Sequence, residues 1–171
     1  RGLVGSEMCI RDSSEIVERV SALQEELKAT GKALAAAQAE LAVAKAGALA
    51  AKAEPVGEFQ LLVERLDGVD GAGLQGAAQS LADQLGDASA VVLGGLPDPS
   101  DLGKVILVAA FGKQVIAAQL QAGKFIGGIA KLCGGGGGGR PNLAQAGGRD
   151  GSALTDALAK ARSELEAGLQ S

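Results

Sequence analysis

The stretch that decides the fold is KFIGGIAKLCGGGGGGRP, residues 124–141, in which six consecutive glycines follow an apolar segment. Glycine has no Cβ atom, so it visits positive φ angles freely and lets another backbone or a phosphate group come close. The same freedom makes an ordered run of glycines unfavourable in conformational entropy. The run is therefore expected to be either a flexible linker or a loop with a binding partner.

The charge around the glycines favours a partner. Residues 102–149 include six basic residues and no Asp or Glu, whereas the whole chain of 171 residues carries a net charge of −4. A basic surface on an otherwise acidic protein is typical of polyanion binding. We predict that the glycine N–H groups form a nest around an anion, with an arginine fork beside it. The candidate contact residues are Lys113, Lys124, Lys131, Gly134, Gly135, Gly136, Gly137, Gly138, Gly139, Arg140 and Arg149.

Three of these lysines accompany a predicted helix over residues 114–132, whose apolar side chains fall on one stripe. If the helix is continuous, Lys113, Lys124 and Lys131 lie together on the opposite face, because spacings of 11 and 18 residues are close to whole turns. If the chain breaks at residues 121–123, only Lys124 and Lys131 share a face. Lysines on an exposed helix are usually just solubilising, and the absence of neighbouring acids is what favours binding.

The composition argues against chemistry within this chain. It contains no His, no Tyr and no Trp, and its two cysteines form no CxxC pair. The absence of His removes the His-based catalytic arrangements and the commonest metal ligand. We therefore predict no catalytic residue, no metal site and no cofactor, with Cys133 a small buried residue. Base stacking on aromatic side chains is not expected, and no apolar run suits a membrane span, so we expect a soluble intracellular protein.

The N-terminal third is predicted to be helical. Residues 1–12, RGLVGSEMCIRD, share neither composition nor periodicity with the rest of the chain, so we predict a non-native leader, with a short disordered native tail as the alternative. Residues 13–54 are expected to form one long helix that begins with a capping box of Asp12 and Glu15. A coiled-coil spacing predicts a homodimer through residues 16–51, or pairing with a helix further upstream; a solvated helix is the alternative. The a and d positions are Val20, Leu27, Leu34, Leu41 and Ala48, and Ile16, Leu23, Thr30, Ala37, Ala44 and Ala51.

Residues 55–171 are expected to form a small globular domain. A strand pattern over residues 59–63 precedes a helix that Asp70 caps and Gly86 ends. The apolar runs 90–93 and 105–111 indicate buried strands, and a last helix is predicted to start at Ser152 or Thr155. The predicted fold class is α/β (α+β): a long N-terminal coiled-coil-like helix, then a small mixed-sheet globular domain with a glycine-rich loop.

A family resemblance supports this organisation. The stretch KFIGGIAKLCGGGGGGRPNLAQAGGRDGSALTDAL, residues 124–158, resembles the C-terminal, DHHA1-type tRNA-binding domain of alanyl-tRNA synthetases. In that family a helix leads into a glycine-rich loop that ends in GGGRPxxAQAGG, as residues 137–148 do here. The upstream VVLGGL and KVILVAAF are similar to its strands, and residues 17–52 are similar to its long helical subdomain, so the resemblance covers about residues 14–169.

The resemblance implies a tRNA-binding module rather than an enzyme. In the family this domain grips the elbow of tRNA-Ala, where the D and T loops meet, and so couples aminoacylation with editing. The parent reaction is the ATP-dependent attachment of alanine to tRNA-Ala, and the sites for ATP, Mg²⁺ and the editing zinc lie in upstream domains. The helical part also supports dimerisation, and neither DNA nor a membrane is an expected partner. A bacterial cytoplasm or an organelle is the implied compartment.

Two other functions stay open. DHH-type phosphoesterases carry a similar domain, in which a histidine after the glycines holds a substrate phosphate. This chain has Arg140 at that place and lacks the acidic, His-bearing motifs of those enzymes. A structural coiled-coil dimerisation module is the other alternative, although it leaves the basic window unexplained.

Overall fold

The structure is a computed structural model that describes residues 4–170; for residues 4–14, 35, 38, 39, 42 and 43 it describes the backbone only. The chain divides into two compact units, of which the first ends at Ala37 and the second begins at Gln38. The described residues of the first unit are all helical, and the second unit contains every strand of the described residues.

A single helix, α1 (Val4–Ala50), contains the described residues of the first unit and continues into the second. It begins before the predicted capping box at Asp12 and Glu15, so the predicted start was wrong. Residues 4–12 contain no proline, and nothing in them prevents the helix from extending toward the N-terminus. The large apolar side chains of the heptad seam are exposed among the described residues: Ile16, Val20, Leu23, Leu27, Leu34 and Leu41.

The last turns of α1 use a different face. Ala46 is fully buried, and Leu49 and Ala50 are half-buried against the globular core, whereas the seam residues Ala44 and Ala48 are exposed. At 100° per residue, the buried face and the seam lie about 180° apart around the helix. The seam therefore stays free where the helix docks on the core.

A six-stranded mixed sheet forms the centre of the second unit, and its strand order is β1-β2-β3-β4-β6-β5. The β2–β3 pair is parallel and the other four pairs are antiparallel. The strands are β1 (Glu54–Val56), β2 (Phe59–Arg65), β3 (Ser89–Gly95), β4 (Val105–Phe111), β5 (Gly136–Gly139) and β6 (Leu143–Gly148). The predicted mixed sheet is confirmed, while β1, β5 and β6 were not predicted.

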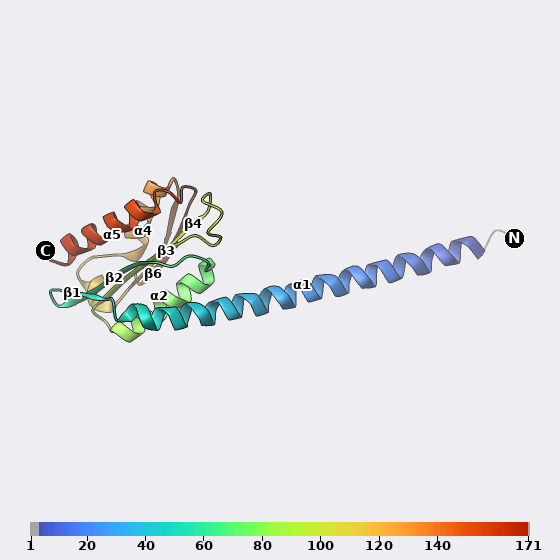
Figure 1. The fold of residues 1–171 in the computed structure, drawn as a ribbon, viewed down its shortest axis with the longest axis horizontal. Coiled ribbons are helices and arrows are strands. Elements are labelled where there is room, and N and C mark those ends of the chain that lie inside the picture. Colours follow the sequence, from blue (N-terminus) through green and yellow to red (C-terminus); the bar gives the residue numbers. More distant parts are fainter. Residues whose placement is uncertain (1–3, 171) are drawn as a thin grey trace. The chain divides into compact units, whose positions relative to one another are not determined.

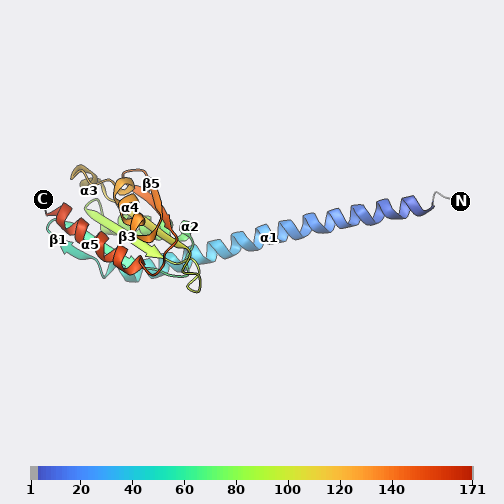
Figure 2. The same cartoon turned by 90° about the horizontal axis from the view of Figure 1, so that it is seen from above.

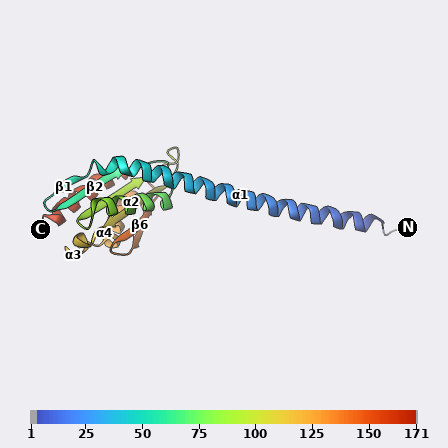
Figure 3. The same cartoon turned by 90° about the horizontal axis from the view of Figure 1, so that it is seen from below.

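Helices cover both faces of this sheet, which makes three layers (Figure 1). Figure 2 shows α4 and α5 over one face, and Figure 3 shows α2 over the other. Successive β3 residues alternate accordingly: Ala90 and Val92 pack with α4 and α5, and Val91 and Leu93 pack with α2. The helices are α2 (Gly71–Leu85), α3 (Lys113–Ala117), α4 (Ala122–Ala130), the 3₁₀ turn η1 (Lys131–Cys133) and α5 (Leu154–Leu169). Among residues 4–170, no helix is both long and apolar enough to cross a membrane.

The predicted cap of α2 is confirmed and gives a first testable prediction. The Asp70 carboxylate accepts a 2.8 Å hydrogen bond from the Gly73 N–H, and Gly86 ends the helix with φ 87°. Asp70→Ala leaves that N–H without its partner, so we expect a loss of about 1 kcal/mol in the free energy of unfolding. Chemical denaturation measures it, with Asp83→Ala on the same helix as the control. An equal loss in both variants would contradict a capping role.

Candidate nucleic-acid interface

The predicted helix over residues 114–132 is broken. α3 ends at Ala117 and α4 begins at Ala122, and between them Gln119 has φ 65°, which a right-handed helix does not accommodate. Lys113 therefore does not belong to the helix face of the other two lysines. Lys124 and Lys131 are seven residues apart and remain within about 20° of each other around the helix.

The glycine run forms a strand rather than the predicted nest. Gly136–Gly139 make up β5, which pairs with β6 in register from Gly136↔Gly147 to Gly139↔Ala144. A nest needs successive residues in right- and left-handed conformations. Gly134, which ends η1 with φ 64°, is the one glycine of the six with a positive φ. The nest was therefore wrong, and the strand presents an extended backbone instead.

Alternate glycines of the run have different surroundings. A Cβ atom at Gly135, Gly137 or Gly139 would lie 1.8, 2.3 or 2.7 Å from backbone atoms of β6, which is closer than any packed structure tolerates. A Cβ atom at Gly136 or Gly138 would meet nothing within 4 Å. Packing therefore explains three of these glycines and leaves Gly136 and Gly138 facing open space.

The helix α4 packs closely on the glycine strand. A Cβ atom at Gly123 would lie 2.7 Å from the carbonyl oxygen of Gly139, and one at Gly127 would lie 3.0 Å from that of Gly137. Because these two helix positions are four residues apart, both face the strand. Gly128 meets nothing within 4 Å, so the outer surface between Lys124 and Lys131 is bare.

Backbone hydrogen bonds place the candidate cations at the two ends of β5. The Ala122 N–H donates to the Pro141 carbonyl at 2.9 Å, which brings the start of α4 and Lys124 beside the hairpin turn that follows Arg140. The Arg149 N–H donates to the Cys133 carbonyl at 2.8 Å, near the other end of the strand. Lys131 lies in the same 3₁₀ turn as Cys133. The glycine strand thus runs between two pairs of basic residues.

The basic window is free of acids in sequence but not in space. Lys113 lines a hollow of about 250 Å³ together with Asp83 and Asp87. Asp150 follows Arg149 directly, and the side chain and backbone of Ser152 both donate to its carboxylate, which holds the pKa of Asp150 below its usual value. Among the described residues, Lys113, Lys124, Lys131, Arg140 and Arg149 form no ion pair. All five of these side chains are also exposed. They therefore have no anionic partner among the described residues.

Cys133 is buried, as predicted. Burial, and secondarily the charge of Asp150, raises the pKa of its thiol, so the unreactive protonated form dominates at neutral pH. Among the residues whose side chains the structure describes, no group of three or more His, Cys, Asp or Glu is placed to hold a metal ion.

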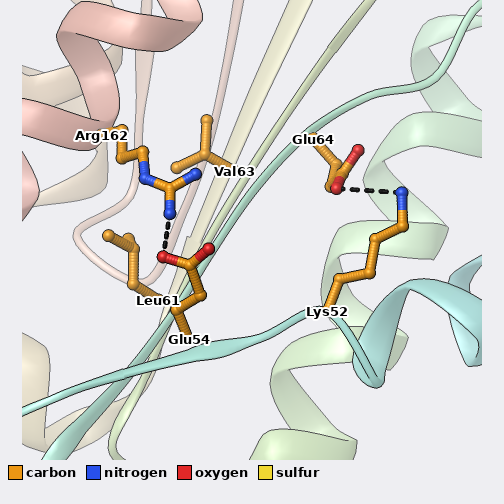
Figure 4. A pocket seen from close by; sticks show the side chains of 6 residues that line it. All are labelled: Lys52, Glu54, Leu61, Val63, Glu64 and Arg162. Atoms are coloured by element: carbon orange, nitrogen blue, oxygen red, sulfur yellow. Dashed lines mark hydrogen bonds and ion pairs between the residues drawn. The ribbon is translucent and has the colours of Figure 1, made fainter.

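Another hollow, of about 320 Å³, has charged walls that are already paired (Figure 4). Arg162 on α5 points at Glu54 of β1 and forms an ion pair with it, and Lys52 forms one with Glu64 at 3.2 Å. The ion pair of Arg162 was not predicted, because β1 was not predicted. Internal pairing leaves this hollow little capacity for a charged ligand.

A third hollow was missed by the sequence reasoning altogether. It lies between α2 and the β5–β6 hairpin and is lined by the amides of Gln75, Gln79, Asn142 and Gln145, beside Arg140. The spacing of Gln75 and Gln79, four residues apart on α2, was the available signal for the helix side. The wall of the hollow formed by the β5–β6 hairpin could not be predicted, because β5 was not predicted as a strand.

Comparison with known proteins places the chain in a family. The profile of the DHHA1 domain matches residues 58–167. The chain is similar to alanine–tRNA ligase of Parasynechococcus marenigrum strain WH8102, with 89% identity over 156 residues, and to that of Synechococcus sp. strain CC9605, with 84% identity over 152 residues. These matches cover 91% and 89% of this chain but only 18% and 17% of the two relatives.

A solved structure agrees with the sequence comparison. The fold is similar to that of the C-Ala domain from Aquifex aeolicus alanyl-tRNA synthetase, with a TM-score of 0.56 and 28% identity. The match covers 70% of this chain and 98% of that domain. The resemblance seen in the glycine motif is thereby confirmed over most of the globular unit. The chain belongs to the DHHA1 domain family, in the form found at the C-terminus of alanyl-tRNA synthetases.

Proposed function

We propose that the chain binds tRNA through the basic glycine surface, defined as Lys124 and Gly128 of α4 and Lys131 of η1 with Gly136, Gly138 and Arg140 of the hairpin. The observation that carries the proposal is that its three cations are exposed and have no ion-pair partner among the described residues. Cations without internal partners are available to neutralise phosphates. Two relatives of the chain are named alanine–tRNA ligase, and this name points to tRNA as the polyanion.

The two open glycines support contact with an RNA backbone. A glycine inside a strand has no side chain to pack and lowers strand stability. Neither a positive φ nor a neighbouring atom requires glycine at Gly136 or Gly138. Their bare surface suits a ligand that approaches the strand closely, and structured RNA is read largely by shape, phosphates and 2′-hydroxyl groups.

We further propose that the bound feature is the elbow of tRNA-Ala, and that this contact couples aminoacylation and editing in a longer ligase. The chain spans 18% of the length of the first relative. We expect the ATP-dependent attachment of alanine to belong to other segments of such a ligase. In such a parent, ATP, Mg²⁺ and zinc are expected to be held by those other segments. The expected place of action is the cytoplasm.

Elbow binding is tested by titrating the chain against folded full-length tRNA-Ala and against an acceptor-stem minihelix that lacks the elbow, at two salt concentrations. We expect a clear preference for the full tRNA, and an affinity that falls steeply as salt rises because phosphate contacts release counterions. Equal affinity for the two RNAs would contradict elbow recognition. No binding to either RNA would contradict tRNA binding by this chain.

Charge reversal on the basic glycine surface gives the second prediction. Lys124→Glu and Arg140→Glu should each weaken tRNA binding by about tenfold or more, because each replaces a phosphate contact with repulsion. Both side chains are exposed, so thermal unfolding should hardly change. Fluorescence anisotropy measures the affinity, and Lys160→Glu on α5 controls for net charge. Unchanged affinity in both test variants would remove this surface from the proposal.

The exposed seam of α1 supports a second role. We propose that residues 16–51 pair with the same helix of a second copy of the chain. Apolar a and d side chains from Ile16 to Leu41 are exposed, and such a seam on a single helix needs a partner to be buried. The alternative partner is a helix of a longer parent, in which case the isolated chain stays monomeric.

A further inference from the structure

The amide-lined hollow between α2 and the β5–β6 hairpin has the features of a ligand site. Its volume is about 480 Å³, which falls in the ~300–1,000 Å³ range of small-molecule sites. Gln75 and Gln79 line one wall, Asn142 and Gln145 line the other, and Arg140 supplies the one charge. No carboxylate lines it, so an anionic ligand meets no repulsion from the walls.

The four amide side chains are free to bind something else. None of them forms a hydrogen bond with another side chain or backbone group of the described residues, whereas Gln84, further along α2, donates to Ser80 at 3.2 Å. The contrast with the hollow in Figure 4 is direct, since the charged groups there pair with each other. Amides that line one hollow and form no hydrogen bond within the protein can offer donors and acceptors to a ligand.

The chemistry of these groups selects the class of ligand. An amide presents two donor hydrogens and one acceptor oxygen, so this hollow matches a ligand that also mixes donors and acceptors. A phosphate group without a base only accepts hydrogen bonds. The carbonyl oxygens of the amide side chains would then have no donor to bind. The edge of a nucleobase has donors and acceptors side by side, and Asn and Gln are side chains that read such edges. The Arg140 guanidinium is suited to the phosphate of the same nucleotide.

We propose that this hollow binds a single unstacked nucleotide of the bound RNA, with the base between the amides and the phosphate at Arg140. The inference rests on the proposed tRNA binding. It assigns the contact with one nucleotide to this hollow. Gly138 also lines the hollow, and a Cβ atom there would meet nothing within 4 Å. The missing side chain keeps the entrance from β5 open. Leu143 and Ala144 add apolar wall in place of an aromatic platform.

The test combines tRNA affinity with its salt dependence. The double variant Gln75→Ala with Gln79→Ala should bind tRNA-Ala about tenfold or more weakly, because base-edge contacts are lost. The slope of log affinity against log salt should not change, since amides neutralise no phosphate, whereas Arg140→Gln should make it shallower by about one. Gln84→Ala on the same helix is the matched control and should bind within about twofold of the original chain.

A second measurement needs no substitution. In NMR spectra of the labelled chain, each of the four ribonucleoside 5′-monophosphates is added, and ribose 5-phosphate serves as the comparison. We expect at least one nucleotide to shift the side-chain amide signals of Gln75, Gln79 and Gln145, with little effect of ribose 5-phosphate. Equal shifts with ribose 5-phosphate would overturn the assignment of a base to this hollow.

The outcomes separate this inference from the proposed function. Full affinity in the double variant, together with weaker binding by Arg140→Gln, would overturn the nucleotide site and leave tRNA binding intact. Full affinity in all of these variants would overturn the nucleotide site and would also contradict a role of Arg140 in tRNA binding. If the double variant unfolds early, Gln145→Ala on β6 provides the same readout from the opposite wall, and full affinity there overturns the site in the same way.

Discussion

Gly137→Ala is expected to lower the free energy of unfolding by about 3 kcal/mol, although it adds a single methyl group. The reason is that its Cβ atom would lie 2.3 Å from the Cα atom of Ala146 on β6, and backbone cannot move aside as a flexible side chain can. The carbonyl oxygen of Gly137 also lies close to Gly127 of α4, so β5 has close neighbours in both β6 and α4. Chemical denaturation followed by circular dichroism measures the loss.

The neighbouring residue provides the control for this prediction. Gly138→Ala introduces the same methyl group in the same strand, but its Cβ atom meets nothing within 4 Å. We expect unchanged stability or a gain of up to about 1 kcal/mol, because alanine restricts the unfolded chain. Equal losses in the two variants would show that the alternation along β5 does not exist in solution.

Leu27→Lys is expected to abolish self-association of the chain. Leu27 occupies an a position and its side chain is 77% exposed, so a second copy would bury it at the centre of the seam. A lysine there places an ammonium group of each chain in an apolar interface, with like charges facing each other. Sedimentation equilibrium over a range of protein concentrations measures the association of the original chain and of the variant.

Ala29→Lys adds the same charge to the other side of the helix. Ala29 lies two residues from Leu27, which is about 200° around an α-helix, and it is exposed. We expect this variant to associate as the original chain does. If the original chain is monomeric, the second-copy proposal is wrong and a helix of a longer parent is favoured as the partner. If both variants lose self-association equally, the seam is not the interface.

The elements that the sequence predicted most reliably are those whose residue pattern is itself typical of a strand or a helix. The apolar runs at β3 and β4 fit strands buried on both faces, and Asp70 and Gly86 mark the two ends of α2 with recognisable side-chain chemistry. The inward residues of α5 repeat with helical spacing and are buried. In these cases local preference and tertiary environment agree.

The candidate site was harder to predict because its structure comes from its neighbours. Glycine has little preference for a strand and shows no periodicity, so β5 exists only because β6 pairs with it and α4 lies against it. The break at Gln119 is not marked by Gly or Pro, the usual signals. The glycine motif identified a segment that the structure places beside α4 and β6, and the binding role of its cations stays a prediction. It did not reveal the backbone arrangement, or the hollow that depends on it.

Near its C-terminal end, α1 uses opposite faces for two different contacts: packing on the globular core and the proposed pairing with another helix. The face with Ala46 holds the helix on the globular core, and the seam about 180° away is left for another helix. A partner helix can therefore be gained or lost without disturbing the packing of α2 beneath the sheet. Coupling between two binding events requires that each changes a state the other senses. If the two proposed roles share no such state, we expect mutations in the seam to change oligomerisation while RNA affinity is kept, and mutations in the basic glycine surface to do the reverse.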